Sequence, residues 1–404
     1  MPESPQGSRL TWLGQLVVLL FIAACAYGAW TLFLKKPLNS TTPNGQEQPA
    51  AKSLFGGGDG PAVEIGIAYG TEKQRWMQWA VEQFAQTKDG KRIKVNLIPK
   101  GSLEAAQAIL AGDEKIHVWS PASALYEDVF VQEWQIKRNK APFVRKEALA
   151  LSPMVFVMWA ERYDAFMAKY KELSFETIGK AVKEPGGWDG IAQKPEWGLF
   201  KFGHAHPNQS NSGLMTLVLM AFDFHKKNRG LEMKDILKPE FQTWMNGIET
   251  ATTGMSNSTG NMMRDMVLRG PSSYDALCVY ESVVIDYLKS AEGRWGELRV
   301  AYPRQNMWND NPYYILDAPW SSADQRKAAG TFLDYLLSEP VQKESLKHGF
   351  RPGNPTVPIK FAESPFVQYQ RFGLQIDLAS VGEAPKADVI NNLLASWQRS
   401  QGNR

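Results

Sequence analysis

The sequence predicts an α/β protein with a parallel sheet covered by helices, and three observations near the start of its folded part support this. Short apolar runs typical of buried strands occupy residues 63–68, 92–98 and 116–119. Stretches with apolar residues at helical spacing fill the gaps at 71–86, where Thr71 is placed to cap the helix, and at 103–110. The resulting strand–helix alternation is the pattern that gives parallel strands joined by helices.

The same alternation continues towards the C-terminus. Further strands are expected at residues 148–159, 198–203, 276–280 and 298–302, and long helices at 323–337, 340–347 and 387–398. A chain of 404 residues with 44% hydrophobic residues is long enough for two domain-sized cores. The net charge of +3 and the lack of a basic stripe argue against a nucleic-acid partner.

The N-terminal region predicts a membrane tether. After a tail at residues 1–9, residues 10–34 contain no charge, and 25 helical residues are enough to cross a bilayer core of roughly 30 Å. An alternative is a cleaved lipoprotein signal, because Ile22-Ala23-Ala24-Cys25 has the form of a lipoprotein cleavage box. Residues 35–61 are rich in Pro, Asn, Thr, Gln and Gly and predict a flexible linker. Both alternatives place the rest of the chain at a membrane.

The candidate binding residues follow the predicted strands. In open α/β sheets, ligands lie beyond the carboxyl ends of the strands. Here those ends are the loops at 68–71, 119–123, 207–213 and 279–282. Three of the four place Ser or Thr at a helix start, where free amide groups and the helix dipole favour an anion. The four loops together therefore predict one binding site.

The segment GHAHPNQSNSGLMTL, which begins at Gly203, allows other interpretations. His204 and His206 can lie on one side of a strand as metal ligands, but no third ligand is evident nearby. The serines at 210 and 212 can be a helix cap that binds nothing. A nucleophilic serine is disfavoured, because the chain contains no G-x-S-x-G motif.

Several segments resemble the bacterial extracellular solute-binding proteins of the molybdate/sulfate-type group. They are, in order, IAYGTEKQRWMQWA, HVWSPASALY, ALSPMVFVMW, GHAHPNQSNSGLMTL, LCVYESVVIDY and HGFRPGNP. The resemblance implies a type II periplasmic-binding-protein fold over residues 62–404, with a ligand cleft between two lobes. Lobe one would comprise about 62–151 and 301–404, and lobe two about 152–300, with crossovers near Ser152-Pro153 and Tyr302-Pro303.

The resemblance also assigns ligand contacts. The residues implied are Gly70, Thr71, Ser120, Ser123, Ser210, Asn211, Ser212, Tyr280 and Glu281. Glu72 and Glu281 would bring carboxylates near the cleft, which would repel an oxyanion unless Arg351 or Lys73 neutralises one of them. The solute is therefore expected to be a small polar or anionic compound, with neutral and cationic solutes also open.

The sequence as a whole predicts a membrane-tethered, extracytoplasmic solute receptor without enzymatic activity, cofactor or bound metal. Lobe closure on the solute would be recognised by an ABC-type permease or a membrane sensor. Two alternatives come from other classes. One is a membrane-anchored, metal-dependent hydrolase that uses His204 and His206. The other is a scaffold that retains the fold without a ligand.

Overall fold

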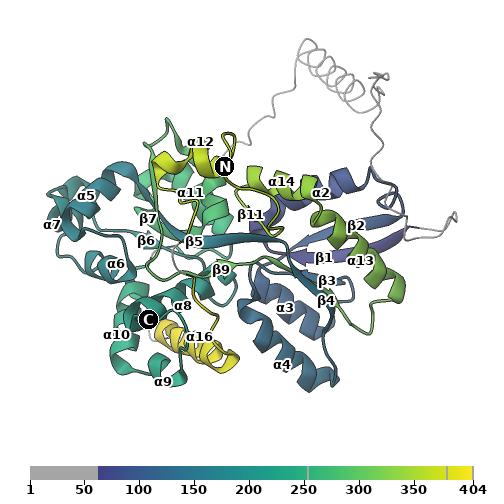
Figure 1. Cartoon of the computed structure of the whole chain (residues 1–404). Coiled ribbons are helices and arrows are strands. Elements are labelled where there is room, and N and C mark those ends of the chain that lie inside the picture. The colour runs from purple at the N-terminus through teal and green to yellow at the C-terminus, as the bar shows by residue number, and fades with distance from the viewer. Residues whose placement is uncertain (1–61, 253, 379–380, 403–404) are drawn as a thin grey trace, which may run out of the picture. The chain divides into compact units, whose positions relative to one another are not determined.

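The computed structural model describes residues 62–252, 254–378 and 381–402 (Figure 1). These residues belong to one compact unit, Ser53–Arg404. The predicted anchor at 10–34 and linker at 35–61 lie outside the described residues. Among the helices that the structure describes, none combines the length and apolar character needed to cross a bilayer.

The first sheet has five strands in the order β2-β1-β3-β10-β4. Strands β1, β2 and β3 are parallel, as predicted, and β10 runs antiparallel between β3 and β4. Along β1, Ile65 and Ile67 join the core beneath α2, α13 and α14, whereas Ala68 joins the core beneath α3 and α4. The sheet is thus covered on both faces (Figure 1). The bounds are β1 Val63–Tyr69, β2 Ile93–Pro99, β3 Val118–Ser120, β4 Phe143–Ala148, β10 Pro312–Leu316, α2 Gln74–Phe84, α3 Ser102–Ala111, α4 Glu127–Arg138, α13 Ala323–Leu336 and α14 Glu339–Lys347.

The second sheet is built around one long strand, β5. It has the order β11-β5-β7-β6, and β8 and β9 also pair with β5. The apolar helix α8, which is buried along most of its length, packs against β5 and β7. The bounds are β5 Ala150–Trp159, β6 Phe202–Gly203, β7 Ala276–Tyr280, β8 Leu298–Ala301, β9 Trp308–Asn309, β11 Arg351–Pro352, α8 Asn211–His225, α11 Thr259–Arg269 and α12 Glu281–Ala291.

Shorter helices and turns complete the unit. The C-terminal helix α16 packs against α8, α9 and α10 beside the second sheet and against α4 beside the first. The remaining bounds are η1 Thr71–Lys73, η2 Ala124–Tyr126, α5 Ala160–Tyr170, α6 Phe175–Ala181, α7 Trp188–Ala192, η3 Pro195–Trp197, α9 Met233–Ile236, α10 Pro239–Ala251, η4 Gly270–Ser272, α15 Pro365–Gln368, η5 Gln370–Phe372 and α16 Ala387–Gly402.

Two of the chain segments that connect the sheets lie side by side. Ser152 and Pro153 of β5 pair with Asn309 and Trp308 of β9. The amide of Asn309 donates to the Ser152 carbonyl at 2.9 Å, and the amide of Asn306 donates to the Met154 carbonyl at 2.7 Å. Both segments are therefore held together where the chain passes between the sheets. The predicted lobe boundaries near these segments stay a prediction.

Several predicted elements need correction. Residues 148–159 form parts of two strands, because β4 ends at Ala148, and the amide of Leu149 instead donates to the carbonyl of Asn311. The strand expected at 198–203 is only β6. Thr71 does not cap a helix, since the turn η1 precedes α2. Strand β4 lacked a prediction because it is a largely exposed edge strand with polar residues, which leaves no apolar pattern to read.

Candidate functional site

The loops predicted to bind a ligand meet where the two sheets face each other. The Gly70 amide donates to the Ser120 carbonyl at 3.0 Å, which joins the loops after β1 and β3. A cavity of about 10 Å³, with room for about one water molecule, opens between the loops. Five of the predicted residues line it, namely Gly70, Thr71, Ser210, Asn211 and Tyr280, together with Glu72, Gly101, Ser102, Asn257, Ser258 and Thr259.

Asn211 connects the loops on both sides of this cavity. Its side-chain oxygen accepts a hydrogen bond from Ser123 Oγ at 2.7 Å. Its side-chain nitrogen donates to the Tyr280 hydroxyl at 3.1 Å and to Asn309 Oδ1 at 2.9 Å. A second contact across the cleft joins Thr71 Oγ1 and Ser258 Oγ at 3.4 Å. The two sides are thus closed on each other through hydroxyl and amide groups.

Ser210 and Ser212 begin α8 without capping it. The Ser210 side chain makes no cap hydrogen bond, and Ser210 Oγ lies 3.0 Å from Ser212 Oγ. Ser212 Oγ in turn lies 2.5 Å from Thr259 Oγ1. The first amides of a helix have no acceptor within it and form a partly positive end. The cap interpretation therefore does not account for these serines.

Gly213 explains why this helix can start so close to the preceding loop. A Cβ atom at Gly213 would lie 2.2 Å from the Ala205 carbonyl oxygen and 2.7 Å from the Pro207 nitrogen. Only glycine permits this approach, since both neighbours are backbone atoms. The P-x-x-S-N-S-G segment thus places the first turn of α8 directly against the loop that leads into the cleft.

Ser120 does not line the cavity, although it lies at the end of β3 next to it. Its side chain is fully buried, and among the described residues its Oγ has no hydrogen-bond partner. An unsatisfied buried hydroxyl costs about 1–3 kcal/mol. The Ser120 hydroxyl is therefore a buried donor close to the cavity.

Lys73 neutralises Glu72 at the edge of the cavity. Lys73 is fully buried, and its Nζ donates to Glu72 Oε1 at 2.6 Å, to the Pro121 carbonyl at 3.0 Å and to Asn311 Oδ1 at 3.1 Å. Burial lowers the pKa of Lys73, and the Glu72 carboxylate opposes that shift. The pair removes the negative charge that Glu72 would otherwise present to an anion.

Glu281 does not line the cavity either, and its side chain is paired elsewhere. It is fully buried, and Arg351 Nε and Nη2 each donate to one of its carboxylate oxygens at 2.8 Å. The Tyr302 hydroxyl also donates to it. Burial acts to lower the pKa of Arg351, but the hydrogen bonds to Glu281 more than offset it and raise that pKa. The geometry thus gives Glu281 a structural partner.

A wider groove of about 350 Å³ adjoins the cavity and shares Thr71, Glu72 and Ser258 with it. It runs between α2 on one side and α11 and α12 on the other, and it contains Arg264 and the pair Arg75 and Asp286. Arg75 Nη1 lies 3.6 Å from Asp286 Oδ1. Burial raises the pKa of Asp286 to about 6, with Arg75 opposing the shift. The groove therefore carries charges of both signs.

Sequence reasoning missed these groove residues, although a signal for them was present. Arg75 follows Thr71 by four residues, and Asp286 follows Ser282 by four. Residues about one turn further along a helix lie near the same face as its start. Extending each predicted strand-end loop by one helical turn would have found them.

The two histidines of the GHAHP segment are linked through Glu249 and Trp397. His204 is fully buried, with Nε2 2.9 Å from Glu249 Oε1, and the Trp397 indole donates to Glu249 Oε2 at 2.7 Å. The His206 ring packs edge-on against Trp397, with centroids 4.9 Å apart. Burial acts to lower the pKa of both, but Glu249 raises that of His204. No group of three or more metal-ligating side chains occurs within the described ranges.

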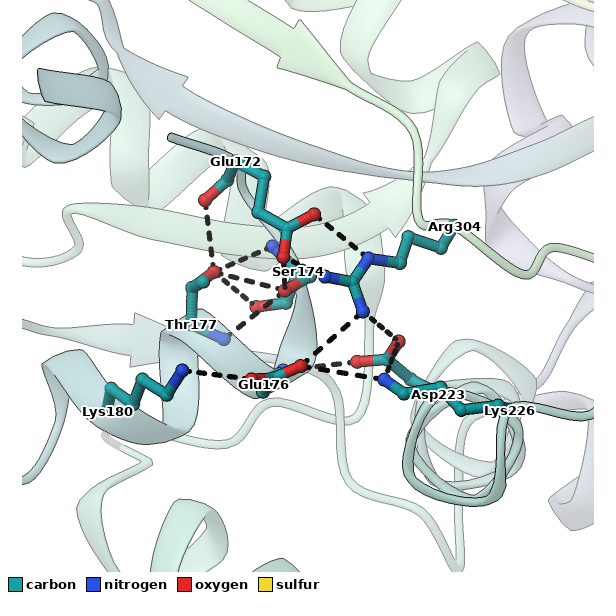
Figure 2. Close-up of polar contacts among 8 residues, drawn as sticks. All are labelled: Glu172, Ser174, Glu176, Thr177, Lys180, Asp223, Lys226 and Arg304. Atoms are coloured by element: carbon teal, nitrogen blue, oxygen red, sulfur yellow. Dashed lines mark hydrogen bonds and ion pairs between the residues drawn. The ribbon is translucent and has the colours of Figure 1, made fainter. Parts of the chain in front are cut away.

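A charged cluster anchors the segment that returns from the second sheet (Figure 2). Arg304 Nε donates to Glu172 Oε2 at 2.9 Å, and Arg304 Nη1 lies 3.5 Å from Glu176 Oε2 and 3.6 Å from Asp223 Oδ1. Lys226 lies 3.5 Å from Glu176 and 3.6 Å from Asp223. Arg304 therefore ties the returning segment to α6 and to the end of α8.

This arrangement defines a class of protein. Two α/β sheets joined by paired crossing segments, with polar loops meeting between them, form a two-lobe fold of the periplasmic-binding-protein kind. The family model for bacterial extracellular solute-binding proteins matches residues 65–351, which are 287 of the 404 residues. The chain belongs to this family, as the sequence resemblance predicted.

Solved structures share the fold at low sequence identity. The sulfate-binding protein SubI from Mycobacterium tuberculosis H37Rv has a TM-score of 0.53 and 15% identity, covering 85% of this chain and 99% of its own. Iron-bound HitA from Pseudomonas aeruginosa has a TM-score of 0.56 and 15% identity, covering 84% and 99%. The ferric binding protein from Campylobacter jejuni has 0.56 and 12%, covering 84% and 98%. No curated protein sequence matches the chain.

Proposed function

We propose that this chain is a membrane-tethered, extracytoplasmic receptor that captures a small polar or anionic solute between its lobes. The observation that carries the proposal is the meeting of hydroxyl and amide groups from both lobes at the cavity. Ser123 and Thr71 on one side contact Asn211 and Ser258 on the other. Family membership supports the extracytoplasmic place, and residues 10–34 supply the proposed tether.

The proposed mechanism exchanges contacts across the cleft for contacts with solute. When the lobes separate, the bond from Ser123 to Asn211 Oδ1 breaks, and the Ser123 hydroxyl becomes free to donate to solute oxygens. The Ser120 hydroxyl and the amides at the start of α8 are further donors. Lys73 and Arg351 neutralise Glu72 and Glu281, which removes the repulsion that these carboxylates would exert on an anion. A solute that fits between the lobes then stabilises their closed arrangement.

The proposed partner is an ABC-type transporter or a membrane sensor that recognises the closed lobes. Of the three solved structures named above, one is named as sulfate-binding and two are named for iron. These names guide the choice of test solutes without naming the solute of this chain. Glu281 was included in the predicted contact set, but its pairing with Arg351 favours a supporting role for it.

Thermal unfolding of the purified chain against a panel of solutes tests the proposal. The panel contains molybdate, tungstate, sulfate, phosphate, ferric citrate, sugars, polyamines and zinc. A solute at 100 times its dissociation constant adds about 2.7 kcal/mol, which raises the midpoint by several degrees. Ser120→Ala and Ser210→Ala should each abolish most of that rise. Ser272→Ala removes an exposed hydroxyl in η4 and serves as the control.

The same experiment separates the alternatives. A rise with zinc alone that is lost in His206→Ala would favour the metal-dependent hydrolase. If no solute shifts the unfolding midpoint, the cavity binds none of the solutes tested. A scaffold that retains the fold without a ligand then becomes the better description. A rise that survives both cleft variants would contradict the proposed site.

A further inference from the structure

A second cavity, of about 380 Å³, lies in the second lobe and shares no lining residue with the cleft. It is formed by the start of α5, the turns η3 and η4, and the connection from α12 to β8. Figure 1 shows α5 at the end of the molecule away from the first sheet. Its main lining side chains are Trp159, Trp197, Trp295, Glu161, Glu297 and Arg162.

Trp295 gives this cavity an exposed aromatic wall that is held in place. Its side chain is 54% exposed, although indole rings are normally highly buried. The ring packs over Gly270, where a Cβ atom would lie 2.4 Å from it, and Gly270 has a φ of +68°. The indole nitrogen donates to the Leu268 carbonyl at 3.4 Å. Glycine is thus needed at 270 both for its backbone conformation and for the position of the ring.

The cationic side chain in the cavity wall, Arg162, already has partners within the protein. Arg162 Nη1 lies 2.8 Å from Asp275 Oδ1, and both side chains are almost fully buried. The Arg162 guanidinium also lies 4.4 Å from the centroid of Trp197 and 5.2 Å from that of Trp188. Asp275 is also shared with Lys201, whose Nζ lies 3.8 Å from Oδ2, and the Arg162 guanidinium already lies over the Trp197 indole.

The two carboxylates in the cavity wall, Glu161 and Glu297, have fewer partners within the protein than Arg162. The Ala160 amide donates to the Glu297 carbonyl at 2.8 Å, so Glu161 and Glu297 come together from two chain segments. Arg299 Nη1 donates to Glu297 Oε2 at 2.9 Å, while Glu161 makes no ion pair within the described part of the chain. The charged side chains that line the cavity are two carboxylates and one guanidinium, so the lining carries a net negative charge.

We propose that this cavity binds a small organic cation carrying an ammonium group. A cation next to an indole ring is stabilised by the ring quadrupole, and Glu161 supplies the opposite charge. The volume lies at the lower end of the range for ligand sites, which favours a small compound. The site is independent of the proposed solute cleft, because no lining residue is shared.

Choline and its neutral isostere 3,3-dimethylbutan-1-ol provide the test, since they have the same shape and differ in charge. Binding to the purified full chain is measured by calorimetry and by the change in tryptophan fluorescence. We expect saturable choline binding and at least tenfold weaker binding of the alcohol. Trp295→Ala and Glu161→Gln should each weaken choline binding at least fivefold. Glu196→Gln is the matched control, because Glu196 is exposed next to Trp197 but does not line the cavity.

Four outcomes would overturn the proposal. The first three are no saturable choline binding, equal binding of choline and the alcohol, and unchanged choline binding in Glu161→Gln. Choline binding that is lost in Ser210→Ala would also overturn it, because the ligand would then lie in the cleft. Since Ser210→Ala changes only the cleft, failure of the two proposed sites can be told apart.

Discussion

The cleft and the crossing segments beside it use polar groups in different ways. Across the cleft, the lobes are joined by hydroxyl and amide contacts such as Ser123 to Asn211 at 2.7 Å and Thr71 to Ser258 at 3.4 Å. Next to the crossing segments, a fully buried carboxylate, Glu281, is bound by both arms of a guanidinium. Neutral contacts are cheap to exchange for ligand or water, whereas a buried charge cannot lose its partner without a large cost.

The difference shows which parts of the molecule can move. Arg351, in β11, binds Glu281 at the start of α12. It also donates to the Gln375 and Ile376 carbonyls, so it links β11, α12 and the segment that contains these two carbonyls. These elements should therefore stay together when the lobes separate. The neutral contacts across the cleft are the ones that opening would break.

The largest expected effect comes from breaking the buried pair. Arg351→Met leaves Glu281 buried without its cation, and the free energy of unfolding should fall by about 3–5 kcal/mol. Urea unfolding measures it. Arg371→Met is the control, because Arg371 and Glu292 form an exposed pair that contributes at most about 1 kcal/mol. Equal losses in the two variants would remove the contrast between the fixed and the movable contacts.

An intermediate effect is expected from pH at the groove. Burial raises the pKa of Asp286 to about 6, so the folded protein holds this proton more tightly than the unfolded chain, in which the pKa is about 3.9. Its stabilising contribution is present at low pH and is lost as the pH rises through about 6. Between pH 4 and pH 7, the free energy of unfolding of Asp286→Asn should therefore rise by about 2–3 kcal/mol relative to that of the wild type.

Unfolding midpoints measured across this pH range check that expectation. Glu82→Gln, at an exposed position of α2, is the control, and its unfolding midpoint should change with pH in the same way as that of the wild type. If Asp286→Asn also runs parallel, Asp286 titrates as it does in the unfolded chain. The groove would then not bury its carboxylate.

The smallest effect is expected within the cleft. Thr71→Val keeps the shape of the side chain and removes its hydroxyl contact with Ser258. Because that contact is long and partly buried, the free energy of unfolding should fall by less than about 1 kcal/mol. Urea unfolding beside Arg351→Met gives a direct comparison. If the free energy of unfolding fell by nearly as much as in Arg351→Met, the contacts across the cleft would be as costly to break as the buried ion pair.

Some of this could be predicted from the sequence because it depends on local pattern. The parallel strands β1, β2 and β3 follow from apolar runs separated by helical spacing. The loops after β1, β6 and β7 were predicted to form one site, and Thr71, Asn211 and Tyr280 from these loops do line one cavity. In open α/β sheets such loops lie beyond the carboxyl ends of the strands, whatever the details of the helices.

The placement of β10 shows what local pattern cannot give. Strand β10 comes from the other end of the chain and inserts antiparallel between β3 and β4, which leaves no mark on the apolar runs themselves. The partners of Glu281 and Glu72 could be named as candidates, but only the fold assigned Arg351 to the first and Lys73 to the second.

The sequence by itself determined the α/β class and the family, because these depend on neighbours along the chain. Only the tertiary structure decided that Glu281 turns away from the cleft to Arg351, 70 residues later, and that Trp295 and Glu161 border one cavity. Burial and pairing depend on residues distant in sequence, and these determine which charges are neutralised and which stay available to a ligand.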